Sequence, residues 1–222
     1  MGNLVAVLGE NLKNQPWELP AWKGDIRPYG EEMILKVKQA GRDTLPTEPL
    51  HIWEYPIAKY EYLVAIDPSS GMHQGDPAAI QITRGGGLQV AEMLIEKRSP
   101  EEQLRIAVWL CEFYNEATLA VEVNGGPGAY IMQRLTESDI YRNLWRDMYT
   151  GLSGYFNRKD VREKSIAWLQ ESLKNGYQMM RSLRMREQLE AFESNGPADD
   201  DLVHTFLIAH YCMYNRFYTA WK

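Results

Sequence analysis

The chain has 222 residues, 45% of them apolar, and a formal net charge of −6. This length allows one sizeable hydrophobic core, or one domain with an attached arm. The longest apolar runs, such as Tyr62–Ile66, are far shorter than the roughly 20 residues of a membrane helix, and the first residues lack the pattern of an export signal. Cys111 and Cys212 lie in apolar helical patterns without metal-ligand or CxxC spacing, which predicts buried free thiols. We therefore expect a cytoplasmic protein without a membrane partner.

Charge is unevenly distributed along the chain. Residues 1–133 carry 11 basic and 18 acidic side chains, residues 134–186 carry 11 and 6, and residues 187–222 carry 2 and 6. A negative chain argues against a nucleic-acid partner, because phosphates are normally bound by basic surfaces. The positive middle block is consistent with a phosphate-binding face beside an acidic pocket, and solvated surface charge explains it equally well.

Residues 1–59 are expected to form an arm or linker ahead of a domain that spans residues 60–222. Six prolines interrupt this segment, so that only Tyr29–Ala40 fits a helix. Three strands are then predicted at Glu61–Asp67, Ala78–Arg84 and Leu88–Lys97, and the glycines between the last two indicate a hairpin. These glycines are not a phosphate-binding loop, since the GxxxxGK[ST] pattern of an ATPase is absent from the chain.

Helices and short strands alternate through the remainder. Helices are predicted at Pro100–Tyr114, Ala129–Leu135, Val161–Lys174 and Leu183–Phe192 and after the "NGPADDD" segment, and strands at Thr118–Val123 and Gly176–Arg181. Three antiparallel strands followed by strand and helix units predict an α/β fold with a mixed sheet.

Acidic residues stand at the ends of several predicted elements. Asp67 ends the first strand, Asp76 precedes the second, Glu122 lies in the fourth, and Asp200 or Asp201 begins the last helix. If the first and fourth strands are neighbours, Asp67 and Glu122 approach each other at one end of the sheet, where the last helix can add Asp201. Carboxylates packed in this way need protons or cations, and Mg²⁺ or Mn²⁺ would satisfy them.

Each member of this group also has a purely structural interpretation. The two Asp-Pro pairs, Asp67 and Asp76 with the prolines after them, are typical of turns, and Asp199 suits the cap of the last helix. Glu122 is flanked by valines, so its side chain must either face solvent or be compensated. His204 and His73 are open to both interpretations, although a histidine on a helix face is more often structural than a ligand.

Four segments of the chain resemble a known family. They are "YLVAIDPSSGMHQGDPAAIQI", "AVEVNGGPGAYIMQRL", "GYFNRKDVREKSIAWLQESLKNGYQMMRSLRMREQLEAFE" and "DDDLVHTFLIAH". In order and approximate spacing they are similar to blocks of the nuclease domain of tailed-bacteriophage terminase large subunits, over about residues 60–215. The resemblance implies a ribonuclease H-like fold, related to Holliday-junction resolvases, and a two-metal endonuclease centre that uses Mg²⁺ or Mn²⁺.

The resemblance also implies the site residues. Carried over by position, the catalytic metal ligands are Asp67, Glu122 and Asp201, with Asp200 as the alternative to Asp201 and Asp76 as an auxiliary ligand. The residues implied to contact DNA are Arg158, Lys159, Arg162 and Lys164, which lie inside the positive block. Asp199 departs from the family, which often has histidine there.

The implied partners are double-stranded DNA, an ATPase motor domain, a small terminase subunit and a portal, all in the cytoplasm of an infected host. Without a motor motif, the chain is expected to be either an excised nuclease domain or a gene product divided from its motor. Two alternatives remain: a resolvase-like nuclease that selects branched DNA, and a docking module for the motor that does not cut.

Overall fold

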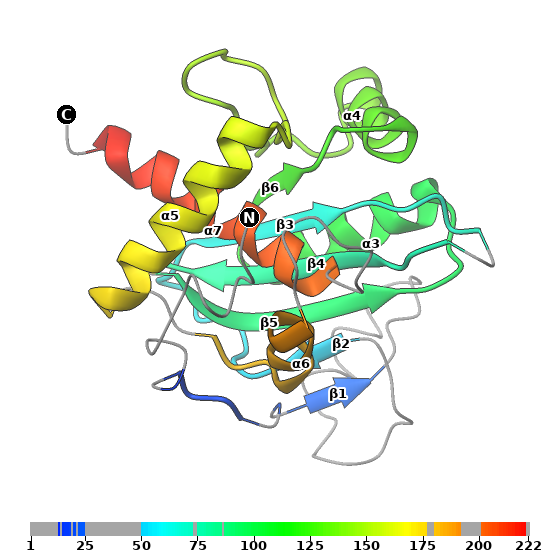
Figure 1. Ribbon diagram of the computed structural model, residues 1–222. Coiled ribbons are helices and arrows are strands. Elements are labelled where there is room, and N and C mark those ends of the chain that lie inside the picture. Colours follow the sequence, from blue (N-terminus) through cyan, green and yellow to red (C-terminus); the bar gives the residue numbers. More distant parts are fainter. Residues whose placement is uncertain are drawn as a thin grey trace.

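The computed structural model describes residues 13, 15–18, 20, 22–24, 50–72, 75–85, 87–176, 180–191 and 201–220. They form a mixed sheet with helices on both faces (Figure 1). Its strands are β1 (Trp22–Gly24), β2 (Leu50–Ile52), β3 (Tyr62–Asp67), β4 (Ala78–Arg84), β5 (Leu88–Ile95) and β6 (Thr118–Val121). Their spatial order is β1-β2-β5-β4-β3-β6; β6 runs parallel to β3, and the other neighbours are antiparallel. The predicted α/β mixed sheet, with three antiparallel strands before the parallel one, is confirmed.

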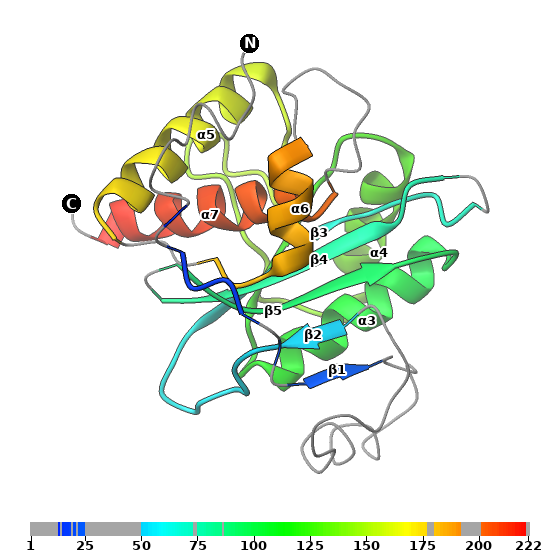
Figure 2. The same cartoon turned by 60° about the horizontal axis from the view of Figure 1, so that its bottom comes forward.

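The helices cover the sheet in two layers. They are α3 (Pro100–Phe113), α4 (Gly126–Ser138), α5 (Lys159–Lys174), α6 (Leu183–Ala191) and α7 (Asp201–Ala220). Figure 2 shows α3 and α4 on one side of the sheet, and α5, α6 and α7 on the other. Each lies within a few residues of its predicted place, because the apolar stripes and the proline at the start of α3 mark them in the sequence.

The strand predicted at Gly176–Arg181 is wrong within the described residues, where Gly176, Met180 and Arg181 have no strand structure. The backbone amides of Arg181 and Ser182 donate to the side-chain oxygen of Gln89, at 2.6 and 2.9 Å. A side chain of β5 therefore satisfies the amides that a neighbouring strand would have used.

Strand β3 is buried on both faces, which explains why its sequence is a continuous apolar run. Tyr62, Val64 and Ile66 pack into the cluster that contains α3, whereas Leu63 and Ala65 pack into the cluster that contains α7. Cys111 and Cys212 lie in these two clusters as buried free thiols, as predicted.

Two pieces of the expected N-terminal arm belong to the sheet. Strand β2 pairs with β5, and β1 pairs with β2. The Trp53 indole, just after β2, donates to the carbonyl oxygen of Glu18 at 3.0 Å. The predicted helix Tyr29–Ala40 lies outside the described residues. Among the helices that are described, none has the length and apolar character needed to cross a membrane.

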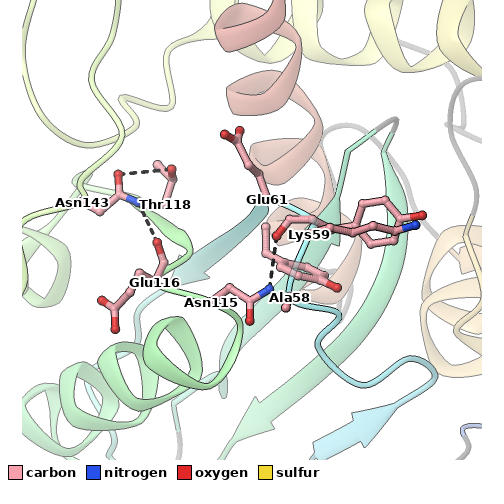
Figure 3. A pocket seen from close by; sticks show the side chains of 9 residues that line it. Ala58, Lys59, Glu61, Asn115, Glu116, Thr118 and Asn143 are labelled. Carbon is pink, nitrogen blue, oxygen red and sulfur yellow. Dashed lines mark hydrogen bonds between the residues drawn. The ribbon is translucent and has the colours of Figure 1, made fainter.

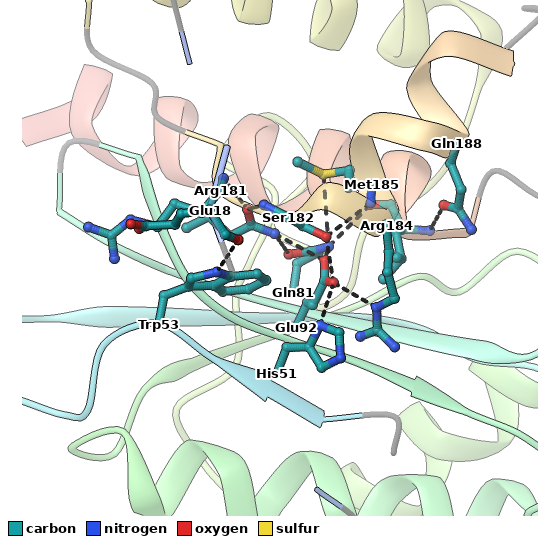
Figure 4. Close-up of polar contacts among 12 residues, drawn as sticks. Glu18, His51, Trp53, Gln81, Glu92, Arg181, Ser182, Arg184, Met185 and Gln188 are labelled. Atoms are coloured by element: carbon teal, nitrogen blue, oxygen red, sulfur yellow. Dashed lines mark hydrogen bonds and ion pairs between the residues drawn. The ribbon is translucent and has the colours of Figure 1, made fainter. Parts of the chain in front are cut away.

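A fully buried carboxylate attaches the start of α6 to the sheet (Figure 4). Glu92 of β5 accepts hydrogen bonds from the Ser182 hydroxyl at 2.5 Å and from Arg184 Nε at 3.0 Å. Its other oxygen accepts from the amides of Gln81 and Gln89, both at 3.2 Å. Every oxygen of this carboxylate is thus paired, which is the usual condition for burying one.

Candidate metal centre

Asp67 and Glu122 meet because of the strand register. The parallel pairing sets Ile66 of β3 beside Val121 of β6. The residue after each of them is acidic: Asp67 follows Ile66, and Glu122 follows Val121. Strand alternation places Asp67 on the same face as Ala65, and Glu122 on the same face as Ala120. Since Ala65 and Ala120 pack in the cluster that contains α7, both carboxylates lie on the α7 side. The predicted meeting of Asp67 and Glu122 is confirmed.

Helix α7 adds a histidine to this pair. His204 precedes Ile208, a buried residue of the same cluster, by four positions and therefore lies on the same side of the helix. Its Nδ1 is 2.9 Å from Asp67 Oδ2 and 3.6 Å from Glu122 Oε2. The candidate ligand atoms of Asp67, Glu122 and His204 all lie within 4.8 Å of one another.

The electrostatics of the group favour an added positive charge, either a proton or a cation. Burial and the neighbouring Asp67 raise the pKa of the Glu122 carboxyl to about 8. Burial opposes charge on His204, but its hydrogen bond to Asp67 and the two carboxylates outweigh burial and raise the pKa of the imidazole. Glu122 Oε2 is buried without a hydrogen-bond partner. A cation would supply what this oxygen lacks.

Glu92 provides the contrast within the same molecule. It is also a buried glutamate in an apolar strand, but burial is outweighed by His51 and Arg184, which lower the pKa of its carboxyl. The geometry thus separates a paired structural carboxylate, Glu92, from the unsatisfied Glu122, whose neighbours fit a divalent cation.

The chain around Glu122 is held by close backbone contacts. The Glu122 amide donates to the carbonyl of Ile66 at 2.9 Å, and Tyr155 pairs on the opposite edge. At Gly128, near the start of α4, an added Cβ would lie 1.9 Å from the Glu122 carbonyl oxygen. Only glycine permits this approach, which fixes the end of the β6 segment next to the site.

Asn157 follows Tyr155 and reaches the histidine. Its side-chain nitrogen is 2.8 Å from His204 Nε2. Its backbone amide and carbonyl exchange hydrogen bonds with the Asn124 side chain at 2.5 and 3.1 Å. No pattern in the sequence singles out Asn157, because its role depends on residues far away in the chain.

Comparison of whole structures, and not of sequences, finds known proteins that are similar to this chain. No protein-family model matches the sequence, and no match was found among curated proteins. Solved structures do match. The large terminase nuclease of thermophilic phage G20c aligns with a TM-score of 0.65 and 15% identity in its cobalt-bound form, over 95% of this chain and 97% of that one. Its magnesium-bound form gives 0.64 and 14%, over 95% and 97%. The nuclease domain of the large terminase of Thermus phage P74-26 gives 0.60 and 14%, over 92% and 93%.

The chain has the fold of a large terminase nuclease domain. These structures confirm the terminase-nuclease fold that the sequence resemblance implied. At sequence identities of 14–16%, these matches show the fold alone. The chemistry has to be argued from the residues of this chain.

On this terminase-nuclease fold, the other predicted ligands lie around the three-residue group. Asp201 is the first residue of α7, one turn before His204, and is not part of the group. Asp76 is exposed just before β4, at the end of the sheet where Asp67 lies, and is also not part of it. Asp200 and His73 lie outside the described residues, as does the predicted cap Asp199.

The basic residues predicted to contact DNA lie at the beginning of α5, immediately after Asn157. Arg158, Lys159 and Lys164 are exposed, and Arg162 is partly buried. Arg162 acts electrostatically on His204, which places its charge near the acidic group. Arg158 forms an exposed ion pair with Asp160 at 3.5 Å.

A polar pocket of about 280 Å³ lies at the other end of β3 and β6 (Figure 3). Tyr62 and Thr118, which begin these strands, help to line it, together with the exposed Lys59, Glu61 and Glu116. Because Asp67 ends β3 and Glu122 follows β6, both at the opposite ends of these strands, this pocket is separate from the candidate metal centre.

Proposed function

We propose that the chain is a Mg²⁺- or Mn²⁺-dependent endodeoxyribonuclease that cuts double-stranded phage DNA during genome packaging. The observation that carries the proposal is the buried Oε2 atom of Glu122, which has no hydrogen-bond partner and lies beside Asp67 and His204. The shared fold supports it, since structures of the G20c nuclease contain bound magnesium, cobalt or zinc.

Asp67 and Glu122 are the proposed central metal ligands and Asp201 the third carboxylate, with Asp76 and Asp200 as auxiliary candidates. Carboxylate oxygens are the ligands that Mg²⁺ and Mn²⁺ accept most readily. Two such ions, when bound, supply a Lewis acid and an activated water for hydrolysis of a phosphodiester. The residues of the chain fix the carboxylates: the β3–β6 register sets their spacing, and α7 covers them from one side.

DNA is proposed to approach over the beginning of α5. Arg158, Lys159, Arg162 and Lys164 provide positive charge next to Asn157 and the acidic group. Such residues bind phosphates without reading the base sequence. The further proposed partners are an ATPase motor domain, a small terminase subunit and a portal, in the host cytoplasm.

Cleavage of supercoiled plasmid tests the function. With Mn²⁺ or Mg²⁺ the purified chain should nick and then linearise the plasmid, and Asp67→Asn should abolish both products. Glu116→Gln is the matched control, because Glu116 is an exposed carboxylate at the opposite end of the sheet. Cutting by Asp67→Asn at the rate of the unmodified chain would refute the proposal.

The same preparation separates the two alternatives. A resolvase-like enzyme would cut four-way junctions faster than linear duplex, whereas a packaging nuclease would cut linear duplex at least as fast. A docking module would show no heat of Mn²⁺ binding in calorimetry and no cleavage of either substrate.

A further inference from the structure

The metal centre proposed above contains one nitrogen as well as its carboxylates. We propose that His204 is a direct ligand, through Nδ1, of the cation held by Asp67 and Glu122, and that this nitrogen makes the site select transition-metal ions such as Mn²⁺ and Co²⁺ against Mg²⁺. The inference rests on the proposed function for the presence of the cation, and it concerns which ion the site prefers.

The distances fit a shared ion. An octahedral cation with bonds of about 2.1 Å sets adjacent ligand atoms about 3.0 Å apart. His204 Nδ1 lies 2.9 Å from Asp67 Oδ2 and 3.6 Å from Glu122 Oε2. One nitrogen therefore faces one oxygen of each carboxylate: the distance to Asp67 matches the spacing of neighbouring ligands, and the distance to Glu122 is about 0.6 Å longer.

A purely structural histidine explains less of the geometry. A hydrogen bond from Nδ1 to Asp67 accounts for the shorter distance alone, and it leaves Glu122 Oε2 buried without a partner. A cation bound to all three side chains satisfies that oxygen as well. Leaving a carboxylate oxygen buried and unpaired is costly, so the arrangement that pairs it is favoured.

Asn157 is suited to both protonation patterns of the ring. With Nδ1 bound to a cation, the remaining ring hydrogen lies on Nε2, which then donates to the Asn157 side-chain oxygen. Without a cation, Nδ1–H donates to Asp67, and Nε2 of the neutral ring accepts from the Asn157 amide nitrogen, 2.8 Å away. An amide serves as donor or acceptor after a half-turn, and the Asn124 side chain holds the Asn157 backbone in place meanwhile.

The nitrogen has a consequence for selectivity. Mg²⁺ binds almost entirely through oxygen ligands, whereas imidazole suits first-row transition ions. The chain should therefore bind Mn²⁺ and Co²⁺ at least about tenfold more tightly than Mg²⁺. His204→Asp, which replaces the nitrogen with oxygen, should reduce this ratio by about tenfold or more.

Pulsed electron paramagnetic resonance of the Mn²⁺-loaded chain is the deciding experiment. We expect a ¹⁴N coupling from a directly bound imidazole in the unmodified chain, and its loss in His204→Asp while Mn²⁺ remains bound. Calorimetry with Mn²⁺, Co²⁺ and Mg²⁺ on both proteins gives the affinity ratios. His210→Gln is the control: this buried histidine of the same helix contacts Ser172 and should leave the ¹⁴N signal unchanged.

The outcomes separate this inference from the proposed function. Absence of ¹⁴N coupling in the Mn²⁺-loaded chain, or equal Mn²⁺-to-Mg²⁺ ratios in the two proteins, overturns it, even if plasmid cleavage still depends on Asp67. Nitrogen coupling in a chain that cuts no DNA would confirm the ligand and refute the nuclease. If His204→Asp fails to fold, the spectrum of the unmodified chain decides alone.

Discussion

Removing the charge of Glu122 should stabilise the metal-free protein. Burial and Asp67 raise the pKa of Glu122 from 4.5 to about 8. Because the pKa of Glu122 is higher in the folded protein than in the unfolded chain, the proton on this carboxyl stabilises the folded state. This stabilisation is fully present below the unfolded pKa, near 4.5, and is lost as the pH rises through 8. The glutamine of Glu122→Gln carries no charge. The free energy of unfolding of the variant should therefore rise above that of the unmodified chain as the pH increases from about 4.5 to about 8, and it should stay higher above pH 8.

The size of the gain follows from the same shift. At about 1.4 kcal/mol for each pKa unit, the full shift sets a ceiling of about 5 kcal/mol on the free energy of unfolding. Relaxation and water penetration reduce the cost of a buried charge in folded proteins, so we expect a gain of about 1–3 kcal/mol. For a chain of this size that corresponds to a rise in Tm of about 2–12 °C.

Thermal unfolding in a chelator, at several values between about pH 5 and pH 9, measures this gain. Glu92→Gln is the matched control of opposite sign: Glu92 is fully buried and paired with Arg184, so its loss should cost about 2 kcal/mol near neutral pH. A Glu122→Gln variant that is less stable than the unmodified chain at every pH would refute the claim that burial and Asp67 make the charge on Glu122 unfavourable.

Two further substitutions test the surroundings of the site. Gly128→Ala should lower the free energy of unfolding by about 1–3 kcal/mol and weaken Mn²⁺ binding, because the new Cβ meets a backbone carbonyl at the end of the β6 segment at 1.9 Å. Calorimetry and thermal melts measure both effects, and Gly126→Ala is the control, since its Cβ meets nothing within 4 Å. Removing Arg158 and Lys164 together should weaken duplex binding and reduce the slope of its salt dependence by about 0.9 for each phosphate that is no longer neutralised. Fluorescence anisotropy at several salt concentrations measures this slope. Removing Lys59, at the opposite pocket, is the control and should not change the slope. Equally weakened duplex binding in the two variants would contradict a DNA-binding face on α5.

The side on which the two carboxylates lie was predictable once the first and fourth strands were taken as neighbours. The apolar run that ends at Asp67 and the short strand before Glu122 both contain residues buried on either face, which is typical of neighbouring central strands. Once they are paired in parallel, alternation alone sends both carboxylates to the same side. The repulsion between packed carboxylates gave the expectation of a cation, and the family resemblance added that of a two-metal nuclease.

The contribution of His204 was not predictable in the same way. Residues 201–215 of α7 are buried on nearly all sides, so their apolar residues do not mark a single face, and the periodicity says little about where His204 points. Asn157 gives no signal either, since it lies in an irregular segment before α5 whose path is set by pairing with the edge of β6. Strand β2 was missed for a related reason: its three residues stand among prolines, and only pairing with β5 makes them a strand.

The two buried glutamates show where sequence reasoning reaches its limit. Glu92 and Glu122 both interrupt apolar strands, and the pattern around them does not show which one the fold satisfies. The partners of Glu92, Ser182 and Arg184, come from about 90 residues away and complete its hydrogen bonds. Glu122 instead meets a second carboxylate and keeps one oxygen unpaired. Since folding satisfies one glutamate and leaves the other unsatisfied, the second is the one that a cation can stabilise.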